Sequence, residues 1–146
     1  MNGYLAILAR LRADGPLGTM IGGSTVATAR IFPGEAPQGK AYPLVRVETF
    51  DATPWDTNSG IATTDTDMVK VFACSPLDSE CYLMSDYIRD SLDGASGVFN
   101  SITMEYCRYL RTDTYDTEVS NVDGSTKHQR IRIHEHDYEV RVRVNQ

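Results

Sequence analysis

Two histidines late in the sequence have a spacing that suits metal binding. His134 and His136 flank Glu135, so both imidazoles would point to the same side of a strand. Imidazole nitrogens bind zinc and related ions, and His128 is a third candidate ligand. Any strand with two alternating histidines has this spacing, however. We therefore favour a polar strand face and keep a small metal-dependent enzyme as the alternative.

A carboxylate pair and a thiol are the other candidates for catalysis. Asp65 and Asp67 would share a strand face, but the segment from residue 50 to 69 contains neither His nor Lys to partner them. Cys81 falls on the apolar stripe of a predicted helix, which favours a small buried residue over a nucleophile. The segment Gly22–Thr25 lacks the lysine of a phosphate-binding loop. We therefore predict no catalytic site, no metal site and no cofactor.

Arginines alternate with apolar residues along the last predicted strand, at positions 130, 132, 141 and 143. Acidic residues at 135, 137 and 139 are interleaved with them, which disfavours a nucleic-acid patch. The pattern predicts an amphipathic strand that faces solvent or another subunit. We expect Arg141 and Arg143 to pair with acids of a neighbouring copy.

The composition excludes several classes of protein. The chain has 146 residues, which we treat as one domain, 1–146, and its net charge is −6. No apolar run reaches the ~18 residues of a membrane span, and no secretory leader begins the sequence. The acidic balance disfavours a broad nucleic-acid-binding face. The three cysteines lack a Cys-x-x-Cys spacing and predict reduced thiols.

The negative charge is concentrated in two segments. Phe50–Val69 and Thr112–Thr126 each hold four acids and no Lys or Arg, whereas the other residues include 12 acids and 14 bases. Both segments are rich in Thr, Ser, Asn, Gly and Asp, a composition typical of loops. We therefore predict two long polar loops, which either keep the protein soluble or determine which partner binds.

Apolar periodicity predicts the elements that would position these residues. One helix spans about residues 4–11 and ends at Gly15-Pro16, with room for one short turn over 16–21. A second helix starts at Ser75-Pro76 and ends at Gly94, and its apolar stripe contains Leu77, Cys81, Met84, Ile88 and Leu92. Strands are expected at about 30–32, 44–49, 68–73, 102–111 and 129–144. The fold class is therefore α+β, a mostly antiparallel sheet with two helices packed on one face.

The last strand changes phase midway. Ile131 and Ile133 are apolar at odd positions, whereas Tyr138 and the following valines are apolar at even positions. A strand of fixed register places these two sets on opposite faces. We therefore predict a bulge or bend near residues 134–137.

Exposed apolar residues in the acidic segments suggest contacts with other chains. Trp55 is the only tryptophan and follows Pro54 in the first segment, so it either folds back or docks on a partner. The predicted partner contacts are Phe50, Trp55, Asp56 and Ile61 in the first segment, and Tyr115 and Val119 in the second.

Residues 30–47 resemble a known family. Arg30–Pro33 (Arg-Ile-Phe-Pro) is followed by Ala36–Pro43 (Ala-Pro-Gln-Gly-Lys-Ala-Tyr-Pro), which leads into a strand, and Ile88–Gly94 (Ile-Arg-Asp-Ser-Leu-Asp-Gly) ends a helix. These motifs and the final Arg/Val strand resemble the tail-completion, or tail-terminator, proteins of long-tailed bacteriophages and gene-transfer particles. The resemblance covers nearly the whole chain in element order, although family members vary most in the two acidic segments.

The resemblance implies a structural virion protein, assembled in the host cytoplasm, and not an enzyme. It implies a homohexameric ring that caps the tail tube, contacts the major tail protein and the head connector, and lets DNA pass without binding it specifically. We hypothesise that acidic residues line the ring's lumen, namely Asp51, Asp65, Asp113, Asp116 and Glu118. The alternatives are another neck ring such as a head-completion protein, the metal enzyme, and a monomeric ligand-binding module.

Overall fold

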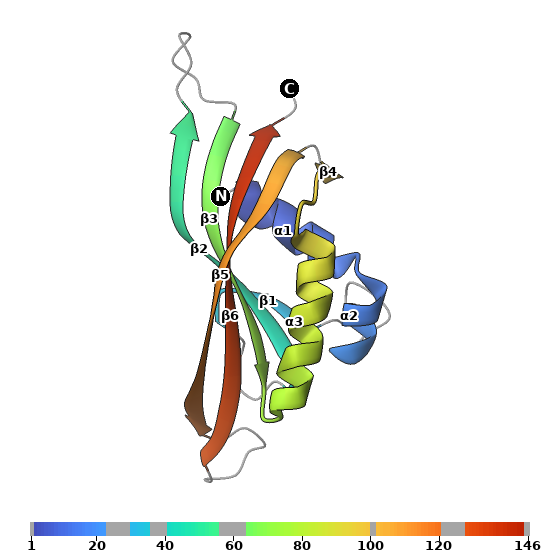
Figure 1. Ribbon diagram of the computed structural model, residues 1–146, viewed down its shortest axis with the longest axis vertical. Helices are drawn as coiled ribbons and strands as arrows, with labels where there is room; N and C mark the ends of the chain where they lie inside the picture. Colours follow the sequence, from blue (N-terminus) through green and yellow to red (C-terminus); the bar gives the residue numbers. More distant parts are fainter. Residues whose placement is uncertain are drawn as a thin grey trace.

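The sheet is the organising element of the structure, a computed structural model (Figure 1). It describes residues 2–22, 30–35, 41–55, 64–99, 102–120 and 128–144, with the backbone alone at 51–55, 64, 65, 119, 120, 128 and 144. Six strands in these ranges pair in the order β1-β2-β3-β6-β5-β4. They are β1 (Ile31–Pro33), β2 (Leu44–Trp55), β3 (Thr64–Ser75), β4 (Gly97–Phe99), β5 (Ile102–Ser120) and β6 (His128–Val144). Only β1 and β2 pair in parallel, so the predicted mostly antiparallel α+β fold is confirmed.

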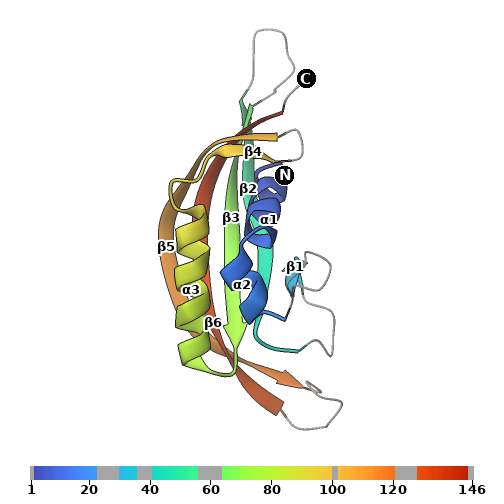
Figure 2. The same ribbon diagram turned by 90° about the vertical axis from the view of Figure 1, so that its right-hand side faces the viewer.

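Three helices cover one face of the sheet (Figure 2). They are α1 (Asn2–Arg12), α2 (Gly15–Met20) and α3 (Asp78–Leu92), so the described chain has one helix more than expected. Helix α2 forms because the Asp14 side chain accepts a hydrogen bond from the Leu17 N–H at 2.9 Å, and Pro16 suits the first turn. Gly15-Pro16 therefore follows the end of α1, as predicted, and also forms the first turn of α2.

Helix α3 starts later than predicted. Its first residue is Asp78. Ser75 lies before the helix, where its hydroxyl accepts a hydrogen bond from the Leu77 N–H (3.1 Å) and donates one to the Glu80 carboxylate in the first turn (2.6 Å). Leu77 is 56% exposed and does not belong to the apolar stripe. Cys81, Met84, Ile88 and Leu92 are buried as predicted.

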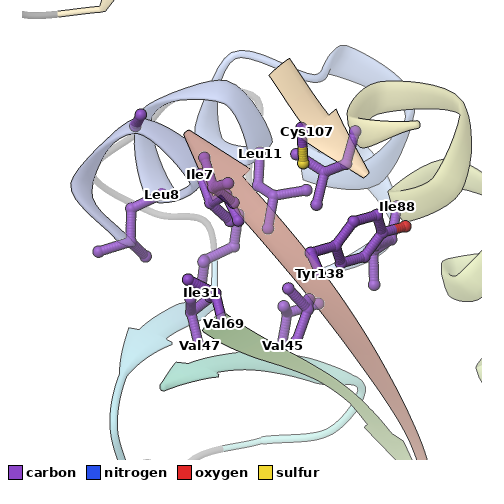
Figure 3. Packing of buried hydrophobic residues seen from close by; sticks show 14 of the residues in the cluster. Ile7, Leu8, Leu11, Ile31, Val45, Val47, Val69, Ile88, Cys107 and Tyr138 are labelled. Atoms are coloured by element: carbon purple, nitrogen blue, oxygen red, sulfur yellow. The ribbon is translucent and has the colours of Figure 1, made fainter. Parts of the chain in front are cut away.

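The main hydrophobic core lies between the helices and the sheet (Figure 3). Ile7 and Leu11 from α1 and Ile88 from α3 pack on Val69 and Tyr138 of the central strands. Each such side chain is worth roughly 1.5–3 kcal/mol when removed from water. This core fixes which face of every strand points away from the helices.

A second, smaller core lies on the other face of the sheet, which we call the open face. It contains Leu44, Phe72, Cys74, Ile131 and Ile133, against which Phe32 and Tyr42 pack. The odd-numbered isoleucines of β6 therefore belong to this core, and the even-numbered Tyr138, Val140 and Val142 belong to the main core. The predicted bulge at 134–137 is wrong, because β6 keeps one register with β3 from Arg132 to Arg143 and two cores accommodate both phases. The register shifts in this region are in β5, between Met104 and Tyr106 and between Tyr109 and Arg111.

The acidic segments are largely strand. β2 continues to Trp55, β3 begins at Thr64, and β5 continues to Ser120. The prediction of two long loops is therefore wrong for most of their length. Threonine is a strong β-former, and it alternates with aspartate here, so these residues form polar strands. No helix in the described ranges is long and apolar enough to span a membrane.

Candidate assembly interface

An ion-pair network crosses the open face. Lys70 on β3 pairs with Glu135 and, at 3.4 Å, with Asp137, both on β6. Asp137 also pairs with the Arg111 Nε of β5 at 2.9 Å. The Glu135 and Asp137 side chains are only 12% and 5% exposed, so their charges are covered by these partners. Burial would lower the pKa of Lys70, but the two carboxylates raise it overall.

Two of the predicted contact residues, Phe50 and Tyr115, lie beside this network. The Lys70 Nζ lies 4.6 Å from the centroid of the Phe50 ring, a cation–π contact. Burial and then the charge of Glu135 raise the pKa of Tyr115 to about 12. Phe50 is 45% and Tyr115 39% exposed. Phe50 and Tyr115 are 65 positions apart in the sequence. On the open face they are connected, because Phe50 contacts Lys70, Lys70 pairs with Glu135, and Glu135 interacts with Tyr115.

The open face also carries aromatic and arginine groups that the sequence analysis missed. The Arg46 guanidinium stacks 4.4 Å from the centroid of the Phe72 ring, beside the small core. Tyr106 on β5 is 36% exposed and donates a hydrogen bond to Glu139 at 3.0 Å. The sequence did contain a signal for this second apolar surface. Phe72 and Cys74 alternate along β3 with Val71 and Ala73, so both faces of this strand carry apolar residues. The open face therefore combines an apolar end with a paired, charged middle.

Two acids of the second segment, Asp113 and Asp116, have basic partners. Asp116 pairs with Arg130 (2.7 Å) and Arg132 (3.3 Å), and Arg132 reaches Asp78 of α3 at 3.1 Å. The hydrogen bond from Arg130 is the main cause that lowers the pKa of Asp116. These four residues line a cavity of about 420 Å³. Asp113 lies 3.8 Å from Arg111, and Glu118 is exposed. Pairing across strands thus offsets charge that is unbalanced within the segment.

The remaining predicted contact and lumen residues have different placements. Arg141 pairs with Glu105 of its own chain at 3.0 Å, and Arg143 is exposed. The backbones of Asp51 and Trp55 lie in β2, that of Asp65 in β3 and that of Val119 in β5. Asp56 and Ile61 lie outside the described residues.

The two histidines of the metal hypothesis are buried on the helix side of β6. Both are 2% exposed. The Ser85 hydroxyl lies between them, 3.2 Å from the His134 Nδ1 and 2.8 Å from the His136 Nε2, and donates to the Cys81 carbonyl at 2.7 Å. The Nδ1 of His136 bonds the Thr112 hydroxyl at 2.8 Å. These ring nitrogens therefore bind protein groups, and the described side chains include no cluster of three or more potential metal ligands.

The geometry also gives Asp67 a structural role. Asp67 is fully buried, and its carboxylate accepts a hydrogen bond from the Gly3 N–H at 2.7 Å. This N–H lies in the first turn of α1, where the helix dipole favours a negative charge. Asp67 thus holds α1 on β3.

Comparison with known proteins identifies the family. The family model described as "Tail completion protein gp17" matches residues 5–134. The chain belongs to this tail completion family. It is a structural component of the virion tail, as the resemblance in its motifs implied.

A solved structure shows the same fold. A chain in the structure entitled "Virion of native gene transfer agent (GTA) particle" aligns with a TM-score of 0.62 and 18% identity. The alignment covers 94% of this chain and 91% of that chain. A comparison with curated proteins gave no match.

Proposed function

We propose that the chain is a tail terminator. Six copies form a ring that caps the tail tube at its final length, contacts the major tail protein on one side and the head connector on the other, and lets DNA pass through its centre. The family match over residues 5–134 carries this proposal. The likeness over 94% of the chain to a protein in a gene transfer agent particle supports it.

The open face supplies surface suited to contact with other virion proteins. Phe50 and Tyr115 offer partly exposed rings held in place by Lys70 and Glu135. Aromatic rings with fixed positions are favoured at interfaces because little side-chain entropy is lost on binding. The partner contacts we propose are Phe50, Trp55, Asp56, Ile61, Tyr115, Val119, Arg141 and Arg143.

The acidic residues of both segments would face the lumen in this proposal. Asp113 and Glu118 are exposed on β5, and Asp51, Asp65 and Asp116 belong to the same two segments. A lumen with few unpaired cations offers phosphates few ionic contacts, so DNA would slide without being held.

Electron microscopy of particles that lack the chain tests the terminator role. We expect unattached tails of abnormal length, restored to normal by the wild-type chain supplied in trans. Tails of normal length beside heads that leak DNA would instead identify a head-completion ring. Normal joined particles would contradict both roles.

A further inference from the structure

Two long stretches of strand edge lack a partner strand among the described residues. β1 pairs only with Val45–Val47, so no described strand pairs with the outer side of β2 from Glu48 to Trp55. β4 pairs only with Ile102–Met104, and Gly94 donates to the Cys107 carbonyl at 3.0 Å. In the part of the chain that the structure describes, no strand therefore pairs with the outer side of β5 from Arg108 to Ser120. We call these stretches the β2 edge and the β5 edge.

The two edges lie on opposite sides of the sheet and run in opposite directions (Figure 2). Each step from β2 through β3 and β6 to β5 is antiparallel, so β5 is antiparallel to β2. The edges are also displaced along the strands. The registers place Thr114 of β5 level with Val45 of β2, about five residues, or about 17 Å, from the middle of the β2 edge.

The two edges lack some of the features that usually prevent pairing. Natural sheets blunt a free edge with charged side chains, especially lysine, or with proline, bulges, a short strand or a covering element. The β5 edge has no Lys or Pro over 13 residues, although it carries Arg, Asp and Glu side chains and a register shift between Tyr109 and Arg111. The stretch beyond that shift, which includes the exposed side chains from Asp113 to Glu118, keeps one register with β6. Thr49 and Phe50 are exposed on the β2 edge. Pro54 has no N–H, so pairing there would be confined to about Glu48–Thr53.

We propose that the β2 edge of one copy pairs with the β5 edge of the next, and that this pairing closes the ring into one continuous antiparallel sheet. The inference rests on the ring of the proposed function and names the contact that builds it. Copies related by rotation keep the same strand direction, so the pairing between them is antiparallel, like that within each copy. Two different edges that meet make a heterologous contact, which is the kind that forms rings.

The displacement of the edges fits a closed sheet. A sheet closes into a barrel only when its strands tilt and the register shifts steadily around the axis. Within one copy the β2 edge and the β5 edge are offset by about five residues. Pairing these two edges therefore shifts the strand register by this amount at each contact between copies. β1 and β4 cover the other halves of the two sides, so the aligned, untilted contact is blocked. A second copy is the natural occupant, because each chain presents both halves of the contact.

Disulfide trapping in assembled particles tests the pairing. Thr49 is level with Val69 and faces the helix side, as do even-numbered β5 residues such as Thr114, which is level with His134. Thr49→Cys would be combined with cysteine at each even-numbered position of β5 from 112 to 118. Each double-cysteine variant would be supplied in trans to particles that lack the protein. The assembled particles would then be exposed to an oxidant. Thr49→Cys with Asp90→Cys, on an exposed part of α3, is the matched control.

The proposal predicts disulfide-linked ladders up to the full ring for at least one even-numbered position and for none of the Asp90→Cys controls. Amide hydrogen exchange of the wild-type chain gives a second measurement. Residues 48–53 and 108–120 should become protected in the assembled form relative to the free chain. Joined tails with neither ladders nor this protection would overturn the edge pairing and leave the terminator role standing. If the deletion leaves joining unchanged but purified rings show ladders, the terminator role fails and the edge pairing holds.

Discussion

The carboxylate of Asp67 accepts a hydrogen bond from the backbone N–H of Gly3, 64 residues away in the sequence and 2.7 Å away in space. The contact joins the start of α1 to the middle of β3. It is fully buried, so water does not compete for it.

Asp67→Asn should therefore lower the free energy of unfolding by about 2 kcal/mol, because a charged acceptor at a helix N-terminus is lost. Urea denaturation measures the change. Asp113→Asn, at an exposed position, is the matched control and should change stability little. If both substitutions lower the free energy of unfolding by the same amount, the contact between Asp67 and Gly3 does not stabilise the fold as predicted.

Gly3→Ala tests the same contact from the other side. A Cβ at Gly3 would lie 2.8 Å from the Asp67 Oδ2 and 3.0 Å from the Asp67 Cβ. We expect Gly3→Ala to destabilise the wild-type chain and to cost much less in an Asp67→Ala background. A double-mutant cycle from urea midpoints measures the coupling. Strict additivity would contradict the predicted clash.

The pH dependence of stability should report on His136. Burial, then His134 and Arg89, lower its pKa to about 4, whereas Asp93 and Asp137 act in the opposite direction. The unfolded chain binds this proton below about pH 6.5, but the folded chain does not until about pH 4. The contribution is thus present above pH 6.5 and is lost as the pH falls toward 4, by up to about 3 kcal/mol.

His136→Gln should flatten this part of the profile. Urea denaturation at pH 7 and pH 4.5, in both chains, isolates the contribution of this histidine from that of other groups. A wild-type chain and a His136→Gln variant that lose the same stability would rule out the neutral, buried imidazole.

The thiols should be unreactive in the folded chain. Burial raises the pKa of Cys81 and of Cys107 to about 12, and it also raises that of Cys74. Since the thiolate is the reactive form, a disulfide reagent at pH 8 should label none of the three quickly. In denaturant all three should react. Fast labelling of the native chain would show that a cysteine is accessible, and the trapping experiment would then need a cysteine-free background.

Truncation of the aromatic residues among the proposed contacts should weaken joining and leave the fold intact. Phe50→Ala, Tyr115→Ala and Trp55→Ala should each reduce the fraction of heads with tails by several-fold, since anchors of this type often contribute more than 1 kcal/mol. Leu83→Ala is the matched control, because Leu83 is 43% exposed on α3, on the other side of the sheet. A large drop in melting temperature for Trp55→Ala would instead identify a core residue.

Charge reversal tests the acidic lumen. Asp113→Lys and Glu118→Lys are tested separately, because the two side chains lie on opposite faces of β5. Each should leave head–tail joining normal, and the one that faces the lumen should slow DNA release, because phosphates would meet unpaired cations. Release from purified particles triggered in vitro, at low and at high salt, measures the effect, and salt should relieve it. Unchanged release at low salt would place these residues away from the DNA path.

The sequence predicts the elements well where local pattern and burial agree. The stripe of Cys81, Met84, Ile88 and Leu92 faces one sheet, so a single helical period describes α3. Gly94, with a φ of 69°, ends that helix region as expected. The mostly antiparallel sheet follows from strands that are connected without helices.

The wrong predictions share a physical cause, which is the second buried face. A strand with one buried face shows one apolar phase, but β6 buries Ile133 on one face and Tyr138 on the other. The change of phase thus resembled a bulge. The polar strands around Thr114 lie in a hairpin that needs no apolar alternation, and composition alone could not distinguish them from a loop. The network of Lys70 and Glu135 depends on pairing between distant strands, which the sequence does not state.

The central place of β6 also affects how the chain is made. β6 is synthesised after every other described strand, yet it alone joins β3 to β5. Among the described strands, no pairing other than that of β6 connects the β2–β3 pair with the β5–β4 pair. A chain that ends before residue 128 therefore cannot complete the sheet, and nothing in the sheet holds the β2 edge and the β5 edge in one body.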